Sequence, residues 1–210
     1  MGLTASDTGS SRKPAPIGTH LAYCYQVIDL GTQTSTFDGE KKTAHKVWLG
    51  FELTEEKGDD GKPVTVGTFS SVSLHEKATL RKWLEAWRTR AFTADELKGF
   101  KLTNILGKSC MVTVTHKQKA NGGISDVVAS VTAPPKGVQP SGPMNNTPTT
   151  LDLDADKFNK AVYEALPKFL QDVIYRSPEG LKVVAPGQPS GQNTTGTTTG
   201  EAYSDEGIPF

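Results

Sequence analysis

Apolar and polar residues alternate most regularly between Ala44 and Leu53. One side of this segment carries Val47, Leu49, Phe51 and Leu53. The other side carries Lys46, Trp48 and Glu52. Strict alternation over this length predicts a β-strand with one buried and one solvent-facing side. We therefore expect Trp48 on the solvent-facing side, with a lysine beside it.

Four further segments have strand-like patterns, namely Thr19–Leu30, Val64–Val72, Lys108–His116 and Ile124–Thr132. The residues expected to point inward in the last two are Cys110, Val112, Val114, Val127, Ala129 and Val131. Between the first two strands, residues 31–42 are predicted to form a polar loop with a turn at Phe37-Asp38-Gly39. The parity of the third strand slips, and Gly67 would allow a bulge there.

A helix is predicted after the third strand. Ser73 and Glu76 have the spacing of a capping box, which would place the start of the helix there. The helical stripe that follows consists of Leu80, Trp83, Leu84 and Trp87, so both of these tryptophans are expected to pack in the core. Thr93 and Glu96 form a second capping box, and Lys98-Gly99 ends its short helix.

Three strands, a helix and two more strands form the order of a five-stranded OB-fold barrel, in which the helix joins strands three and four. The sequence thus predicts a mainly β protein with this barrel over residues 17–135. The usual ligand surface of such a barrel is the outer face of strands two and three. Trp48 falls there, and so does Phe69 if it faces the same side.

Residues outside the barrel form five further segments. The expected divisions are a flexible N-terminal arm (1–16), a linker (136–150), a short helical appendage (151–185), a disordered linker (186–200) and an acidic tip (201–210). In the appendage, Pro167 separates two apolar helical stripes. The appendage is too short to hold its own core, so we expect it to dock on the barrel or on another copy.

The net charge of zero is the sum of a positively charged part and a negatively charged part of the chain. Residues 1–137 hold 18 Lys and Arg against 14 Asp and Glu, and the remainder holds 5 against 9. A basic body with an acidic tail favours an anionic partner for the body. The two cysteines, Cys24 and Cys110, are predicted to be buried thiols of a reduced compartment, so we expect a cytoplasmic protein. No apolar run approaches the ~20 residues that cross a bilayer, and no membrane partner is expected.

The sequence offers weak support for catalysis or for a bound cofactor or metal. Gly107-Lys108-Ser109 lacks the earlier glycine and the following helix of a phosphate-binding loop. Asp152, Asp154 and Asp156 alternate as in a calcium loop, but Lys157 and Tyr163 replace the glycine and the closing glutamate. The four histidines lack partners at metal-ligand spacing. Two alternatives remain open: a metal-dependent nuclease that uses these aspartates, and a protein-binding adaptor that does not bind DNA.

The end of the sequence carries its most specific pattern. Acidic residues followed by Ile208-Pro209-Phe210 resemble the C-terminal tip of bacterial single-stranded DNA-binding proteins. Between about residues 17 and 180, the chain resembles the phage-encoded type of single-stranded DNA-binding protein. The segments that carry this likeness are Gly50-Phe51-Glu52-Leu53, Ser73-Leu74-His75-Glu76-Lys77 and Leu106-Gly107-Lys108-Ser109-Cys110.

The resemblance implies a bacteriophage protein without enzymatic activity that acts in the bacterial host cell. It would coat single-stranded DNA non-specifically during DNA replication, recombination or repair. The tip, in which we assign Asp205, Glu206, Ile208, Pro209 and Phe210, would recruit replication and repair proteins. In this sequence Gly207 separates the acids from Ile208.

Bases stack on aromatic rings and phosphates attract cations, so the predicted DNA-binding residues are of these two kinds. The aromatic candidates are Trp48 and Phe69, followed by Tyr23 and Tyr25. The cationic candidates are Lys41, Lys42, Lys46, Lys62, Arg81, Lys108, Lys117 and Lys119. The protein could act as a monomer or a homodimer.

Overall fold

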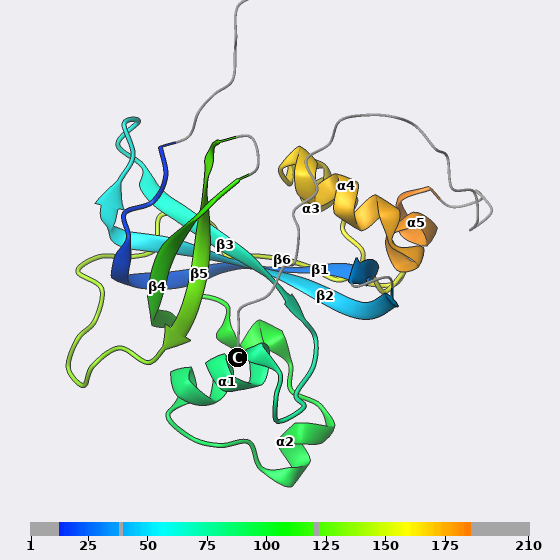
Figure 1. Ribbon diagram of the computed structural model, residues 1–210, viewed down its shortest axis with the longest axis horizontal. Coiled ribbons are helices and arrows are strands. Elements are labelled where there is room, and N and C mark those ends of the chain that lie inside the picture. Colours follow the sequence, from blue (N-terminus) through cyan, green and yellow to red (C-terminus); the bar gives the residue numbers. More distant parts are fainter. Residues whose placement is uncertain (1–12, 38–39, 120–121, 186–210) are drawn as a thin grey trace, which may run out of the picture.

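The computed structural model describes residues 13–37, 40–119 and 122–185 and shows a mainly β protein built on one open sheet (Figure 1). The strands are β1 (Gly18–Phe37), β2 (Glu40–Lys57), β3 (Pro63–Ser71), β4 (Ser109–Gln118), β5 (Ile124–Thr132) and the short β6 (Thr149–Leu151). They pair in the order β3-β2-β1-β4-β5, all antiparallel, and β6 adds to β1 in parallel. The five predicted strands are confirmed. The sheet is not closed, however, so the predicted barrel is not confirmed.

The helices are short and form two groups (Figure 1). Helices α1 (Thr79–Arg88) and α2 (Ala94–Lys98) and the 3-10 helix η1 (Leu102–Ile105) connect β3 to β4. Helices α3 (Lys160–Ala165), α4 (Lys168–Arg176) and α5 (Pro178–Val184) follow β6. None of the helices in the described ranges is both long and apolar enough to span a bilayer.

The inner side of the sheet packs on α1. The predicted stripes are confirmed: Leu80, Trp83, Leu84 and Trp87 are buried with Val47, Leu49, Phe51, Leu53, Cys110, Val112 and Val114. In β5 the inward residues are Val128 and Val131, whereas Val127 and Ala129 are half-buried. The cause is a shift of register, since Val114 pairs with Val128 but Thr113 pairs with Ser130. Ala129 is the extra residue of this bulge, which reverses the alternation before it.

The start of α1 differs from the prediction. The Ser73 Oγ accepts a hydrogen bond from the His75 N–H (3.2 Å), and the Ala78 N–H donates to the His75 carbonyl (2.9 Å). The Ser73 Oγ thus accepts from His75 and its N–H donates to the Ser71 carbonyl, so neither forms the capping box, and the helix begins only at Thr79. The second box is confirmed, because Thr93 and Glu96 exchange both hydrogen bonds at the start of α2.

Two predictions about the connections of the sheet are wrong. The polar loop expected at residues 31–42 is the end of a long hairpin, in which Gly31 pairs with Lys46 and Phe37 pairs with Glu40. The turn residues Asp38 and Gly39 lie outside the described residues. No bulge occurs at Gly67, which pairs in register with Gly50.

The alternation predicts that the outer side of the sheet faces solvent, but part of this side is buried. Here Ile28 and Leu30 of β1 are fully buried in a second core, which also contains Leu151, Leu153, Leu166, Leu170 and Ile174. Complete burial of one such side chain contributes about 1.5–3 kcal/mol. Seven of them contribute on the order of 10–20 kcal/mol before the entropy of ordering is subtracted. Helices α3–α5 are therefore an integral part of the folded unit.

The segment predicted as a linker crosses this outer side and is held by a carboxylate. Glu52 of β2 is fully buried, although its position in the alternation had predicted exposure. Its Oε1 accepts from the backbone and side-chain nitrogens of Asn145 (2.8 and 3.1 Å). Its Oε2 accepts from those of Asn146 (2.7 and 2.6 Å). Burial opposes ionisation, but these four hydrogen bonds prevail and hold the pKa of Glu52 below its usual value.

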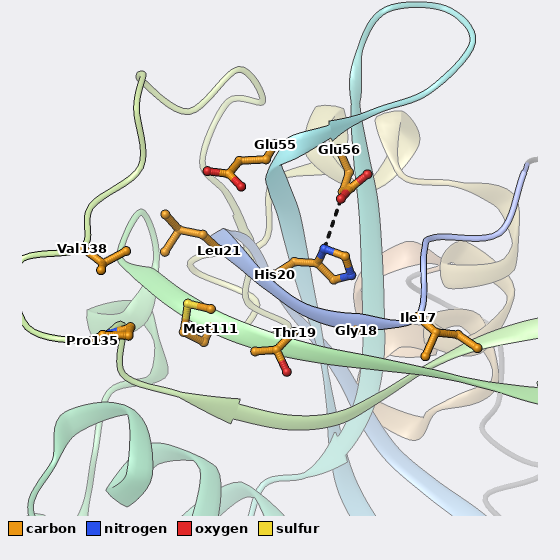
Figure 2. Close-up of a pocket in the computed structure, with 10 residues that line it drawn as sticks. All are labelled: Ile17, Gly18, Thr19, His20, Leu21, Glu55, Glu56, Met111, Pro135 and Val138. Carbon is orange, nitrogen blue, oxygen red and sulfur yellow. Dashed lines mark ion pairs between the residues drawn. The ribbon is translucent and has the colours of Figure 1, made fainter.

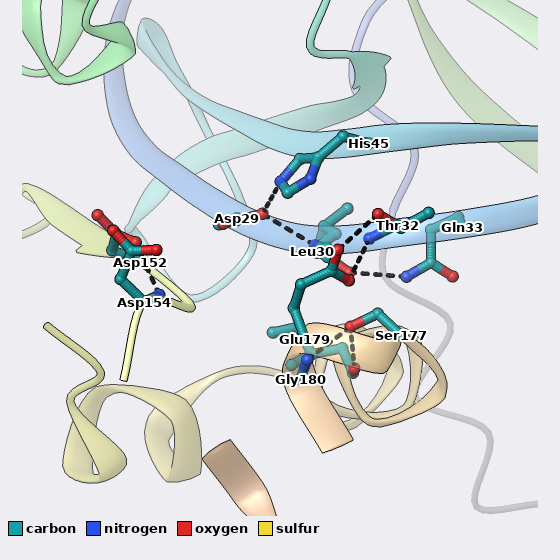
Figure 3. A network of polar contacts seen from close by, with 12 residues as sticks. Asp29, Leu30, Thr32, Gln33, His45, Asp152, Asp154, Ser177, Glu179 and Gly180 are labelled. Atoms are coloured by element: carbon teal, nitrogen blue, oxygen red, sulfur yellow. Dashed lines mark hydrogen bonds and ion pairs between the residues drawn. The ribbon is translucent and has the colours of Figure 1, made fainter. Parts of the chain in front are cut away.

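A second carboxylate fixes the start of α5 to β1 (Figure 3). Glu179 accepts hydrogen bonds from the backbone N–H (2.8 Å) and the hydroxyl (2.6 Å) of Thr32. Burial opposes the ionisation of Glu179, but the hydrogen bonds from Thr32 outweigh this effect and hold its pKa below the usual value. The contact requires Gly31, which has a φ of +68° and would place a Cβ 2.4 Å from the Ser177 Oγ. Glycine at position 31 thus lets α5 approach β1 more closely than any other residue would.

We predict that Gly31→Ala destabilises the fold by about 2–4 kcal/mol, because it combines a disfavoured φ with a steric clash. Urea unfolding measures the loss. The control is Gly61→Ala, since Gly61 has nearly the same φ (+73°) but no atom within 4 Å of the place that a Cβ would occupy. The control isolates the conformational penalty of about 1 kcal/mol. Equal losses in the two variants would show that α5 does not pack against Gly31.

We also predict that Glu52→Gln lowers stability by about 1–3 kcal/mol at pH 7, because the amide turns a donor toward groups that already donate. The lowered pKa means that the contribution of Glu52 is complete above its unfolded-state value of about 4.3 and is lost as pH falls through the folded value. Urea unfolding from pH 7 to pH 2 should therefore show a weaker loss of stability in acid for Glu52→Gln than for the natural chain. Glu76→Gln, at an exposed position, is the control and should preserve the natural profile.

Candidate nucleic-acid interface

Trp48 lies on the outer side of β2, as predicted, but its ring is half-buried rather than exposed. Its ring lies over the backbone of β3, since a Cβ added at Gly67 would fall 2.1 Å from the Trp48 Cζ2. The indole N–H donates to the Gln26 Oε1 (3.3 Å). The absence of a side chain at Gly67 thus lets the indole lie against the sheet.

Phe69 faces the same side as Trp48, which confirms the condition for pairing two aromatic residues on adjacent strands. The two residues are partners in the β2–β3 register, and their ring centroids are 4.9 Å apart at 67°. Edge-to-face geometry of this kind is favourable for aromatic pairs. Both residues are half-buried, so part of each remains accessible.

Phe169 of α4 is a third member of this cluster that the sequence did not assign to it. Its ring centroid lies 5.4 Å from that of Trp48, at 71°. The partner that covers part of Trp48 is therefore a side chain of the same protein. Phe169 belongs to an apolar helical stripe, but the sequence holds no signal for the strand on which that stripe packs. We call Trp48, Phe69 and Phe169 the outer aromatic cluster.

The two tyrosine candidates lie on β1 and are also half-buried. Tyr25 lies beside Gly50, two residues from Trp48 on the same side of β2, because a Cβ added at Gly50 would lie 3.2 Å from the Tyr25 Cε1 and 2.9 Å from the Gln26 Cβ. Tyr23 lies further along the strand, where its hydroxyl donates to the Gly142 carbonyl (3.1 Å). Tyr25 can thus extend the aromatic surface, whereas Tyr23 helps to hold the segment that crosses the sheet.

The structure divides the cationic candidates into groups. Lys46 shares the outer side of β2 with Trp48, two residues away, and Lys41 and Lys42 are exposed on the β1–β2 hairpin. Lys117 and Lys119 lie at the β4–β5 hairpin. Lys62 occupies the β2–β3 turn, 4.0 Å from Asp60.

Arg81 and Lys108 do not share the outer side with Trp48. Arg81 lies on α1, where it pairs with Glu85 (2.9 Å) and donates to the Leu74 carbonyl (3.1 Å). Lys108 precedes β4 and lines a cavity with residues of α1. The structure therefore brings Trp48, Phe69, Tyr25 and Lys46 together but separates Arg81 and Lys108 from them.

A different cleft, of about 480 Å³, opens at the start of β1 (Figure 2). Its apolar lining includes Ile17 and Val138, and Glu55 and Glu56 lie at its upper side in the view. His20 bridges the two ends of β1 and β2 through an ion-pair contact of 3.4 Å with Glu56. Two carboxylates repel phosphates, so this cleft is not part of a nucleic-acid interface.

The cysteine and aspartate side chains that could take part in catalysis are either buried or held in ion pairs. Burial raises the pKa of the Cys24 thiol to about 12 and that of Cys110 well above its usual value, so neither is a ready nucleophile. Lys157 Nζ lies 2.5 Å from Asp154 and 3.4 Å from Asp152, which gives the nuclease alternative no support. Among the residues that the structure describes, no three His, Cys, Asp or Glu side chains are placed to hold a metal ion.

The sequence matches no protein-family model, and no curated protein is detectably similar to it.

Proposed function

We propose that the protein binds single-stranded DNA without sequence preference and that the outer aromatic cluster supplies its stacking surface. The observation that carries this proposal is the pairing of Trp48 and Phe69, whose half-buried rings share one side of the sheet with Lys46. Aromatic rings beside cations form the usual combination for binding unpaired strands, because every base has a face that can stack. The exposed Lys41 and Lys42 would contact phosphates beyond the cluster.

The strand order also supports an OB-type arrangement for this proposal. The two edge strands of the sheet, β3 and β5, contact each other, although they are not paired by backbone hydrogen bonds in the described residues. We propose that the sheet is an OB-type barrel with an incomplete seam, in which α1 fills the position between the third and fourth strands. The proposed interface then corresponds to the usual ligand surface of that fold, of which α4 covers one part.

Binding would be strongest at low salt, because neutralising phosphates releases counterions. The stack on Trp48 is expected to contribute ~1–3 kcal/mol. We predict that Trp48→Leu weakens the binding of a fluorescently labelled dT oligomer about tenfold or more, as measured by anisotropy at two salt concentrations. Leucine retains apolar contact with Phe69 and Phe169 but cannot stack on a base.

The matched control is Phe158→Leu. Phe158 belongs to the same second core, where its ring packs on Tyr163 (5.9 Å) and not on the outer aromatic cluster. This variant should keep its DNA affinity, and thermal unfolding checks that both variants are folded. Unchanged affinity in Trp48→Leu would remove Trp48 from the interface. Failure of the natural chain to bind the oligomer at low salt, with duplex DNA as a comparison, would contradict the function itself.

We further propose that the acidic residues Asp205 and Glu206 and the Ile208-Pro209-Phe210 sequence recruit proteins of replication and repair. These residues lie outside the described part of the chain, so the support comes from their sequence alone. Acids next to an apolar ring suit a basic-rimmed pocket on a partner. We expect deletion of residues 208–210 to abolish partner recruitment and to leave oligomer affinity equal or higher. A clear loss of DNA affinity in the same anisotropy assay would contradict this division of roles.

A further inference from the structure

A cavity of about 410 Å³ lies on the α1–α2 side, away from the outer aromatic cluster. Three cationic side chains line it: Arg88 at the end of α1, Arg90 just beyond it, and Lys108, which precedes β4. Among the described residues, Glu96 supplies the only carboxylate in the lining. The lining therefore has a surplus of two positive charges.

Glu96 is already saturated by its neighbours. It accepts from the Thr93 N–H (3.0 Å) and from both terminal nitrogens of Arg90 (2.8 and 3.1 Å), and it also contacts Arg88. The Thr93 bond and the two arginines lower the pKa of Glu96 to about 2, so the carboxylate remains ionised at neutral pH. Two guanidinium groups share this one carboxylate, which leaves their joint charge only half balanced.

The Arg88 guanidinium is held rigidly at this place. Its Cζ lies 4.5 Å from the centre of the Phe92 ring and 5.0 Å from that of Phe100. Its Nη1 is buried and has no hydrogen-bond acceptor among the residues that the structure describes. An unpaired buried donor is unfavourable by about 1–3 kcal/mol, and here it leaves the Arg88 charge incompletely neutralised beneath the cavity. Nearby, Arg90 is 56% exposed, and Lys108 is exposed as well.

We propose that this cavity binds a phosphate monoester of a nucleotide, with Arg90 and Lys108 as contacts at the rim and Arg88 as the fixed charge beneath. Arg90 gives one N–H of each terminal nitrogen to Glu96, and its other N–H groups remain for phosphate oxygens. A phosphate monoester carries a charge of about −1.5 to −2 at pH 7. That charge matches the surplus of the lining better than a carboxylate or a phosphodiester does. Phe100 is half-buried and offers an apolar surface against which the sugar or the base can pack, whereas Trp87 and Ile105 belong to the core and reach the lining only with their edges.

The ligand could be a free nucleotide or the phosphorylated end of a strand, and these share the same chemistry. Calorimetric titration of the full chain with thymidine 5′-monophosphate should show binding, whereas thymidine should not bind. Arg90→Ala and Lys108→Ala should each weaken binding about tenfold, as expected for loss of one charge-assisted hydrogen bond. Lys82→Ala is the control, because Lys82 is an exposed cation of α1 that does not line the cavity.

The source of the phosphate is distinguished in the Trp48→Leu background, which lacks the proposed stacking residue. Tighter binding of a dT oligomer with a 5′-phosphate than of the same oligomer without it assigns the site to strand ends. Equal binding of the two oligomers, together with retained binding of the mononucleotide, assigns it to free nucleotides. Both results support the site, and both are independent of whether the outer aromatic cluster binds DNA.

Three results would overturn the assignment. One is binding of thymidine as tight as that of its monophosphate. Another is tighter binding of N-acetylphenylalanine, an aromatic carboxylate, which would make the cavity a site for a different class of ligand. The third is an equal effect of Lys82→Ala and Lys108→Ala, which would show that only the overall charge matters.

Discussion

The outer side of β1 and β2 has to be covered, because Ile28, Leu30 and the indole of Trp48 all project from it. The chain covers it with its own residues 151–184. Leu170 and Ile174 of α4 complete the second core, and two buried or half-buried carboxylates, Glu52 and Glu179, fix the segments on either side. The apolar contacts supply most of the stabilisation, and the carboxylates determine where each segment lies. The course of the chain from Asn145 to α5 depends on this contact.

The same contact limits where a ligand can bind. A sheet with a bare outer face would offer all of β1, β2 and β3 to a partner. Here α4 packs against β1, and Phe169 packs against Trp48 at 71°. Trp48, Phe69 and Lys46 stay half-buried on the same side of β2 and β3. The proposed interface is therefore a narrow aromatic surface with lysines on the adjoining hairpin.

Local patterns predicted the elements well, because strand alternation and helical stripes follow directly from which side is buried. The bounds of β5, Ile124 to Thr132, follow from its pattern, and Val131 is buried as expected. Val127 and Ala129 are not, because the bulge at Ala129 has no signal in the alternation. The two capping boxes are equally clear in sequence, but only that of Thr93 forms. The Ser73 Oγ instead accepts a hydrogen bond from the His75 N–H, and the local sequence does not indicate which of the two arrangements forms.

The candidate site could be predicted only in part, for a related reason. Trp48 and Phe69 share a side because they are direct partners in the β2–β3 register, and directly opposed residues point to the same face of a sheet. Their cover could not be predicted, because Phe169 lies far along the chain and its stripe could pack on any apolar face. The burial of Glu52 could not be predicted either. Its position in the alternation predicts an exposed side chain, whereas Asn145 and Asn146, far along the chain, cover it and donate hydrogen bonds to it.

Amide hydrogen exchange of the full chain, with and without a dT oligomer, tests both the cover of the sheet and the position of the interface. We expect slow exchange in α4 and α5 in both states, because their core is never opened. The oligomer should add protection to β3 and to β2 around Trp48. Rapid exchange of α4 in the free protein, or protection by the oligomer confined to β4 and β5, would contradict this account.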